Sequence, residues 1–338
     1  MEQEELERYV RELFTEQGME VSESENLFEV PEANLRYQVF SSEKYSVDEA
    51  EKNALKGCKI FVDPGLEDLE ERFEEVSVIE EEGEHMETPS YEVIGDIAVI
   101  SELPDMDEDE AVEAITEHHP HVKTVLLKEG GLKGEFRVGD YRILYGSETG
   151  TTHTEFGCDF RVDPTEAYYS ERFSTERERV VSQIEEGEDV LVMFAGVGPF
   201  AVMAAKNASP SSVVGIEKNP EAAEYFRENV ALNDVEETVD VIEGDAGKEL
   251  KDRGRFDRIV MPLPGSADEF LEEAFRHTRP GGVIHYYRFI EDGNWEPVVE
   301  ELREASSETG RSFEVRNKVI CGNRGPSVDR ICIDTLIN

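Results

Sequence analysis

The stretch that decides the fold is FAGVGPF at residues 194–200, directly after the apolar run DVLVM at residues 189–193. Its two glycines, Gly196 and Gly198, allow a sharp backbone turn and close approach to a ligand. The proline that follows suits the first turn of a helix, where its missing N–H costs nothing. The pattern predicts a ligand-binding turn between a strand and a helix. The turn alone does not identify the ligand, because Gly196, Gly198 and Ala201 also satisfy the dinucleotide pattern G-x-G-x-x-G/A. Glycine-rich turns also occur in folds that bind no cofactor.

Around this turn, strands alternate with helices from about residue 167 onward. Such alternation predicts right-handed crossovers and a parallel sheet that is covered on both faces. The strands at residues 313–320 and 330–335 have no helix between them, so the last strand is expected to pair antiparallel. The earlier strands are expected at residues 189–193, 213–216, 239–242, 258–261 and 283–287, with helices at 200–205, 220–232, 267–277 and 294–306.

Acidic residues follow the second and third of these strands. Glu217 comes 21 residues after Gly196, where a carboxylate can accept hydrogen bonds from ribose hydroxyls of either NAD or S-adenosylmethionine. Asp245 follows the third strand, where methyltransferases typically read the adenine amino group and dinucleotide enzymes need no acid. The alternative for Asp245 is a helix N-cap. Together the two acids favour S-adenosylmethionine.

The fourth and fifth strands carry turn signals of their own. The fourth ends in Pro262-Leu263-Pro264, and two prolines cannot continue a central strand. They predict a stiff loop at the carboxyl edge of the sheet, where ligands bind in open α/β folds. A Pro-Gly-Gly turn at residues 280–282 leads into the fifth strand, as is common in methyltransferases.

The 338 residues are long enough for several domains, and we divide them into three. Residues 1–85 are predicted to form an N-terminal α/β module of unknown role, with helices at 4–17 and 66–76 and a strand at 59–62. Residues 86–166 are predicted to form a small α/β domain. Residues 167–338 are predicted to form the Rossmann-like domain that holds the glycine turn.

The formal net charge is −45, which at first sight points away from nucleic acid as a partner. An adaptation to high salt would resolve this, since the Debye length falls to about 3 Å in molar salt. Binding would then depend on local cations, and residues 120–145 are net positive against the trend of the chain. The cations of this basic strip are Lys123, Lys128, Lys133, Arg137 and Arg142.

Membranes and metals are not expected. No stretch approaches the roughly 20 apolar residues of a membrane span, and the acidic N-terminus shows no signal-peptide pattern, so we expect a cytoplasmic protein. The four cysteines form no Cys-x-x-Cys pair, which argues against a zinc site and suggests reduced thiols.

Five stretches together carry a family resemblance from about Tyr91 onward. The chain resembles the archaeal and eukaryotic tRNA guanosine-37 N1-methyltransferases, which are class I S-adenosylmethionine-dependent enzymes. The resemblance implies a Rossmann-like methyltransferase sheet, a small α/β domain that contacts tRNA, and the tRNA anticodon loop as partner. The stretches are HPHVKTVLLKEGGLKGEFRVGDYRILYG, EFGCDFRVDPTEAYYSERFSTERERV, MFAGVGPF, DRIVMPLPGSADEF and GGVIHYYRF.

The resemblance also implies roles for individual residues. Guanine N1 carries a proton at neutral pH, and the family's base falls on Glu176. Charge that builds on guanine O6 would be held by Arg137. From the residues alone, Glu176 could equally be an exposed helix residue and Arg137 a surface cation. The implied cofactor residues are Arg177, Phe194, Gly196, Gly198, Glu217, Lys218, Asp245, Ala246 and Pro262; Tyr168, Arg172 and Pro264 would lie near the target base, unless the tyrosines serve in packing.

One departure keeps other functions open. Many family members have Asn-Leu-Pro where this chain has Pro262-Leu263-Pro264, and that asparagine helps to hold the guanine. The second hypothesis is therefore the activity of a sister branch of the family, whose enzymes transfer the aminocarboxypropyl group of the same cofactor to modified tRNA in wyosine synthesis. A non-catalytic tRNA-binding protein is a third hypothesis. An NAD dehydrogenase is weaker, because no second catalytic domain follows the sheet. We expect a monomer.

Overall fold

The computed structural model describes residues 89–103, 106–130, 139–251, 253–325 and 327–338, and the backbone of four earlier strands. The chain forms two compact units, Met1–Met86 and Glu87–Asn338. In the first unit, β1 (Ser22–Ser24), β2 (Leu27–Val30) and β3 (Leu35–Phe40) pair antiparallel, and β4 (Lys59–Val62) pairs parallel to β3. β4 coincides with the predicted strand. The helices predicted at residues 4–17 and 66–76 lie outside the described residues.

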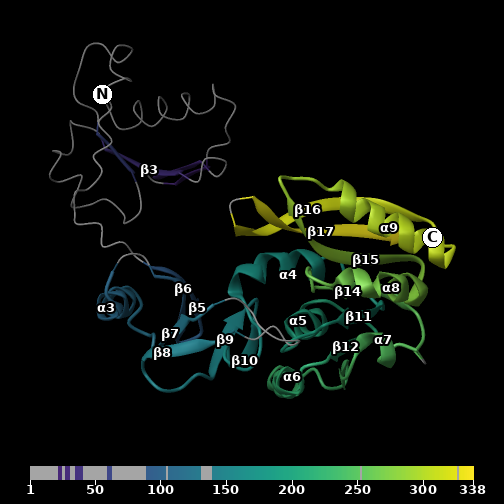
Figure 1. The fold of residues 1–338 in the computed structure, drawn as a ribbon, viewed down its shortest axis with the longest axis horizontal. Helices are drawn as coiled ribbons and strands as arrows, with labels where there is room; N and C mark the ends of the chain where they lie inside the picture. Colours follow the sequence, from purple (N-terminus) through teal and green to yellow (C-terminus); the bar gives the residue numbers. More distant parts are fainter. Residues whose placement is uncertain are drawn as a thin grey trace, which may run out of the picture. The chain divides into compact units, whose positions relative to one another are not determined.

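The second unit is built on a seven-stranded sheet (Figure 1). Numbered along the chain, its strands lie in the order 3-2-1-4-5-7-6. The first five strands are mutually parallel, and β17 runs antiparallel to both of its neighbours, as predicted for the last strand. In space the order is β13 (Val239–Glu243), β12 (Ser212–Glu217), β11 (Asp189–Met193), β14 (Phe256–Met261), β15 (Thr278–Glu291), β17 (Val328–Ile337) and β16 (Phe313–Gly325).

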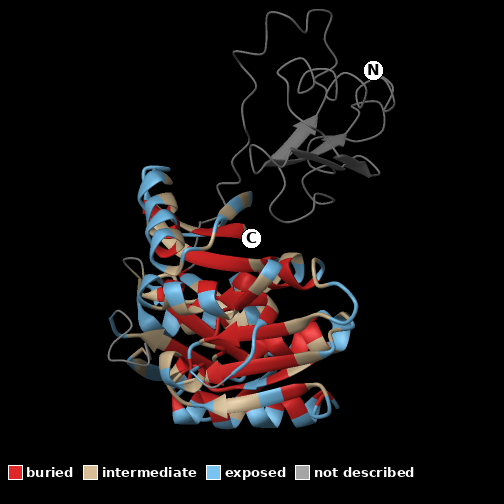
Figure 2. Ribbon diagram, turned by 90° about the vertical axis from the view of Figure 1, so that its right-hand side faces the viewer, coloured by how far each residue is buried: buried red, intermediate tan, exposed pale blue. Residues whose placement is uncertain are grey.

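Helices cover both faces of this sheet, as the packing of alternate residues of β11 shows. Side chains alternate between the faces of a strand. Val190 and Val192 pack into one core with α4 (Ser174–Val181), α5 (Pro199–Asn207) and α6 (Pro220–Leu232), whereas Leu191 and Met193 pack into a second core. The second core includes α7 (Ala246–Glu249), α8 (Leu271–His277) and α9 (Glu296–Thr309). Figure 2 shows the central strands buried and the outer faces of the helices exposed.

A smaller sheet precedes the large one. It consists of β5 (Ser90–Ile94), β6 (Ile97–Glu102), β7 (Thr124–Lys128) and β8 (Tyr141–Tyr145), with α3 (Glu108–His118) as the crossover between the parallel strands β6 and β7. A separate hairpin of β9 (Thr151–Glu155) and β10 (Cys158–Val162) follows. Apolar residues of β5, β6 and β10 join the core of the large sheet, so both sheets belong to one compact unit. The proposed boundary at residue 166 stays a prediction.

The Pro-Gly-Gly segment at residues 280–282 differs from the expected turn before a strand. It lies inside β15, where pairing with β14 shifts from Thr278 opposite Phe256 to Val283 opposite Arg258. The segment is therefore an irregularity in how one long strand pairs with β14. In the described parts of the chain, no helix combines the length and the apolar character needed to cross a membrane.

Candidate active site

The glycine turn lies where the order of the sheet reverses. The chain leaves β11 toward β12 on one side, whereas β14 lies on the other, and ligands bind at such switch points in open α/β sheets. Gly196 and Gly198 have φ values of 59° and 88°, which favour glycine. A Cβ at Gly198 would also collide with the ring of Phe226. Phe194 adopts a φ of 56° without being glycine, and such strain clusters at functional sites.

Glu217 is fixed by the backbone of the turn. Its two carboxylate oxygens accept hydrogen bonds from the N–H groups of Gly196 and Asn219, each at 2.7 Å. Burial raises the pKa of Glu217, although these hydrogen bonds act in the opposite direction. The carboxylate is thereby held at the end of β12, at the place where the sequence predicted a ribose contact.

Asp245 lies at the end of β13 and is paired with Lys218. Lys218 Nζ lies 2.8 Å from Asp245 Oδ2, and this hydrogen bond lowers the pKa of Asp245. Asp245 occupies the N-cap position of α7, but its side chain makes no capping hydrogen bond there. Asp245 therefore occupies the N-cap position, and its carboxylate lies on the cavity wall, held by Lys218.

A cavity of about 380 Å³ lies over the glycine turn, within the size range of small-molecule sites. Its floor is largely apolar, and Phe194 packs edge-on against Phe270 with ring centroids 4.9 Å apart. Tyr168 is 45% exposed at its wall. The predicted site residues on the wall are Arg177, Phe194, Gly196, Glu217, Lys218, Asp245, Ala246, Pro262, Tyr168 and Pro264. A nucleoside cofactor fits this combination of apolar walls and two carboxylates.

The other predicted residues lie elsewhere. Gly198 shapes the turn from behind the wall, against Phe226. Arg172 is largely exposed, with Nε 3.9 Å from Glu92 Oε2. Arg137 lies outside the described residues. The individual roles of the site residues stay predictions.

Arg177 is a buried wall residue whose guanidinium is held by protein partners. Its guanidinium donates two hydrogen bonds of 2.6 Å to Glu155 and one of 3.1 Å to the carbonyl of Ser170. It also lies over the ring of Tyr169, 5.2 Å from the centroid. This bidentate pair joins α4 to the β9–β10 hairpin and fixes one side of the cavity.

Glu176 is buried, which excludes the interpretation as an exposed helix residue. Arg179 donates to both of its carboxylate oxygens, at 2.6 and 2.8 Å. The hydroxyl of Tyr287 donates a further hydrogen bond of 2.6 Å, and burial raises the pKa of Tyr287 so that this donor stays protonated. Glu176 therefore faces a polar network beside the cavity and is not on the cavity wall.

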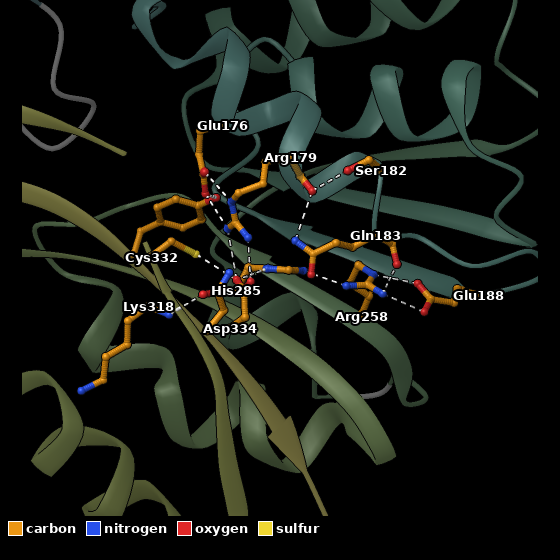
Figure 3. Close-up of polar contacts among 12 residues, drawn as sticks. Glu176, Arg179, Ser182, Gln183, Glu188, Arg258, His285, Lys318, Cys332 and Asp334 are labelled. Carbon is orange, nitrogen blue, oxygen red and sulfur yellow. Dashed lines mark hydrogen bonds and ion pairs between the residues drawn. The ribbon is translucent and has the colours of Figure 1, made fainter. Parts of the chain in front are cut away.

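The network continues from Arg179 across three strands to Glu188 (Figure 3). Arg179 also donates to Asp334 at 2.6 Å, and Asp334 contacts Nδ1 of His285 at 2.6 Å. Arg258 contacts Nε2 of His285 at 2.8 Å and binds Glu188 through two hydrogen bonds. Because an arginine only donates, Nε2 must accept and the His285 proton must lie on Nδ1. His285 is thus neutral, in keeping with a pKa that burial lowers.

Three members of this region could in principle hold a metal ion. Ligand atoms of His285, Cys332 and Asp334 lie within 4.8 Å of one another. However, both ring nitrogens of His285 are engaged, and a divalent cation here would lie beside the guanidinium groups of Arg179 and Arg258. The geometry favours a hydrogen-bond network over a metal centre.

The basic strip of residues 120–145 offers less free charge than its composition suggests. Lys123 lies 2.8 Å from Asp96, and Arg142 binds both Glu108 and Glu129. These pairs are exposed, so they are individually weak and open to exchange for phosphate. Among the described cations of the strip, only Lys128 has no ion pair of this kind.

Sequence reasoning missed several wall residues. Phe173 and Phe270 come from short 3-10 turns, and Phe289 and Arg330 come from the strands β15 and β17. Phe173 lies within the quoted stretch EFGCDFRVDPTEAYYSERFSTERERV and could have been found by its place beside Arg172. No local sequence signal distinguishes Arg330 from the other residues of its alternating strand.

The sheet order, the glycine turn and the two acids define a class I methyltransferase fold with a nucleoside-cofactor site. The TRM5/TYW2 methyltransferase domain model matches residues 151–315, and the TYW2 N-terminal domain model matches residues 69–149. The chain is 37% identical over 293 residues to tRNA (guanine(37)-N(1))-methyltransferase Trm5b of Pyrococcus abyssi, covering 84% of this chain and 86% of that protein.

Two further comparisons, with another relative and with a solved structure, concern the same family. The chain is 34% identical over 230 residues to the tRNA(Phe) (4-demethylwyosine(37)-C(7)) aminocarboxypropyltransferase of Methanocaldococcus jannaschii, covering 67% of this chain and 90% of that protein. The crystal structure of Pyrococcus abyssi Trm5b superimposes with a TM-score of 0.69 at 30% identity, covering 98% of this chain and 96% of that chain. The chain belongs to the TRM5/TYW2 methyltransferase family. The predicted cofactor, S-adenosylmethionine, is the one that this family uses, and the prediction is confirmed.

Proposed function

We propose that the chain transfers the methyl group of S-adenosylmethionine to N1 of guanosine-37 in the anticodon loop of tRNA. The 37% identity to a relative with this named activity, over most of both chains, supports the substrate. The observation that carries the proposal is the single cavity that extends from Glu217 and Asp245 to the Pro262–Pro264 loop and Tyr168. One cavity of this kind can bring a cofactor and a base together.

Bound S-adenosylmethionine would supply an electrophilic methyl group on a sulfonium. Glu217 would accept hydrogen bonds from its ribose and Asp245 from its adenine amino group. Glu176 would take the N1 proton, so that the N1 lone pair is free to attack. Because Arg179 and Tyr287 hold its carboxylate beside the cavity, Glu176 would have to rotate inward as the substrate binds. Its neighbour Arg177 already lies on the wall.

The remaining substrate contacts follow from the family resemblance. Arg137 would hold guanine O6 as negative charge builds on it. Tyr168, half exposed at the cavity wall, would stack on the target base, and Arg172 and Pro264 would border it. Lys128 and the other cations of the basic strip would contact tRNA phosphates.

A second function is favoured by one observation. Pro262 lies on the cavity wall where the family resemblance implies an asparagine, and its carbonyl cannot replace an amide donor. Aminocarboxypropyl transfer to a modified base at position 37, the activity named for the Methanocaldococcus relative, is therefore the alternative.

Isotope position distinguishes these functions. We would incubate the full chain in molar salt with unmodified tRNA, and separately with wyosine-precursor tRNA, each with cofactor labelled in the methyl group or in the amino-acid carbons. Methyl label on the anticodon-loop fragment that carries guanosine-37 supports the proposal, and amino-acid label supports the alternative. Transfer of neither label to either unmodified or wyosine-precursor tRNA, with cofactor binding intact, would mean a non-catalytic binding protein.

The cellular setting is part of the same proposal. A net charge of −45 supports an enzyme adapted to high salt, in the cytoplasm of a halophilic archaeon. We further propose that the protein acts as a monomer and that its chemistry needs no metal. Sedimentation in molar salt and activity after chelation test these two points.

A further inference from the structure

Arg330, on β17, extends to the wall of the cofactor cavity. Its guanidinium carbon lies 4.9 Å from the ring centroid of Phe173 and 5.9 Å from that of Phe289. Both rings are also part of the wall. Such stacking holds a guanidinium in place while leaving its N–H edges open to a planar anion.

No carboxylate in the described part of the chain lies within ion-pair distance of Arg330, and its buried Nε has no hydrogen-bond partner. The other two cations of the wall differ, since Arg177 is paired with Glu155 and Lys218 with Asp245. The chain has 79 acidic residues for 34 lysines and arginines, so an arginine without an acidic partner runs against its composition.

Arg330 lies at the end of the cavity away from the predicted nucleoside contacts. Glu217 is on β12 and Arg330 is on β17, four strand positions away in the sheet. At a strand spacing of roughly 4.8 Å, about 19 Å separates the two backbones. The cavity thus has carboxylates at one end, where hydroxyl and amino groups would be read, and an unpaired cation at the other.

We propose that Arg330 is the anion-binding residue of this pocket and takes an oxyanion of the bound substrates. A guanidinium matches both carboxylate and phosphate through two parallel hydrogen bonds. Two sources share this chemistry when the proposed function holds: the carboxylate of the cofactor's amino-acid tail, and a phosphate that flanks the target nucleotide of tRNA. Either contact would orient the reacting groups from the side opposite Glu217.

The test is Arg330→Gln in the full chain, titrated with three probes in molar salt. S-adenosylhomocysteine carries the carboxylate, 5′-methylthioadenosine lacks it, and unmodified tRNA supplies phosphates. A loss of about tenfold or more for S-adenosylhomocysteine but not for methylthioadenosine identifies the carboxylate, since charged hydrogen bonds contribute about 1.5–3 kcal/mol. A loss for tRNA alone, with the salt slope reduced by about 0.7, identifies a phosphate. Affinities within twofold of wild type for all three probes overturn the proposal.

Arg316→Gln is the matched control. Arg316 is an exposed cation on the neighbouring strand β16, paired with Glu314 at 3.5 Å and not on the cavity wall. Arg316→Gln removes the same charge as Arg330→Gln, so it measures how far the change in net charge alone alters binding. Should Arg330→Gln fail to fold, Arg330→Lys keeps the charge and loses the bidentate geometry, so it must weaken binding of at least one of the same probes. If the wild type binds S-adenosylhomocysteine but modifies no tRNA, the proposed function fails while the two-nucleoside comparison still tests Arg330.

Discussion

Arg179 Nη1 lies 2.6 Å from Asp334 Oδ2, although the two residues are 155 positions apart. The contact joins α4 to β17 and so ties the helix of the proposed base to the antiparallel end of the sheet. Burial alone would raise the pKa of Asp334, but the hydrogen bonds from His285 and Arg179 outweigh burial and lower it. The carboxylate is therefore charged, and it depends on its two partners.

Removing the shared cation should be costly. In Arg179→Met, the carboxylates of Glu176 and Asp334 lose their common partner while they stay buried. Breaking a buried ion pair typically destabilises by about 3–5 kcal/mol, and we expect a loss of this size in urea unfolding. Arg303→Met is the control, because Arg303 also binds two carboxylates but is exposed, and it should change stability little. Equal effects of the two variants would contradict this view of the network.

The neutral state of His285 predicts a pH dependence of stability. Burial lowers the pKa of His285, so the unfolded chain, with a pKa of about 6.5, takes up the proton first. This contribution to stability is complete above about pH 6.5 and is lost as the pH falls, by up to about 1.4 kcal/mol per pH unit. We expect His285→Gln to show a shallower loss between pH 7 and pH 5. Parallel unfolding curves for wild type and variant across this window would show that His285 does not titrate as described.

Substitutions at two glycines distinguish the free-energy cost of backbone strain from that of a steric collision. Gly198 and Gly187 have φ values of 88° and 84°, but only at Gly198 would a Cβ collide with the ring of Phe226. We expect Gly187→Ala to cost about 1 kcal/mol from strain alone. Gly198→Ala should cost more and should weaken binding of S-adenosylhomocysteine at least tenfold, because the turn must shift. Thermal unfolding and calorimetric titration of both variants measure the difference, and equal losses would remove the steric explanation.

If Glu176 is the general base, its substitution should lower turnover without lowering cofactor affinity. In Glu176→Gln, the amide oxygen can still accept from Arg179 Nη2 and Tyr287, although the contact with Arg179 Nε is lost. Arg179 also keeps Asp334 as a partner, so the fold and the cofactor affinity should be retained. Loss of a general base typically lowers the rate by about 10²–10⁴. Single-turnover methylation and calorimetry with S-adenosylhomocysteine check the two halves. A turnover within twofold of wild type would leave Glu176 as a structural member of the network.

The sheet and its cofactor end could be predicted from the sequence because their signals are local. A run such as residues 189–193 followed by FAGVGPF specifies strand, turn and helix within a dozen residues, and β11 and α6 have the predicted bounds. Glu217 and Asp245 follow their strands directly, so the topology brings them to one edge. The pairing irregularity at residues 280–282 was missed because it depends on β14.

The other end of the site depends on residues that are distant in sequence. The run STERER around Glu176 has the composition of an exposed helix, and it is buried only because Tyr287 and Asp334 approach from β15 and β17. In the same way, Arg330 becomes a wall residue only when β17 lies beside β15. No periodicity within either segment contains this information.

The strand order also has a consequence for synthesis of the protein. β16 precedes β17 in the chain, yet β17 lies between β15 and β16. As the chain leaves the ribosome, β16 therefore has no partner, and the apolar β15 keeps an open edge until β17 arrives. Unpaired strand edges invite association between nascent chains. The interval between emergence of β15 and insertion of β17 is thus a period in which the nascent fold is exposed to aggregation, and the same late strand delivers Asp334 and Arg330 to the site.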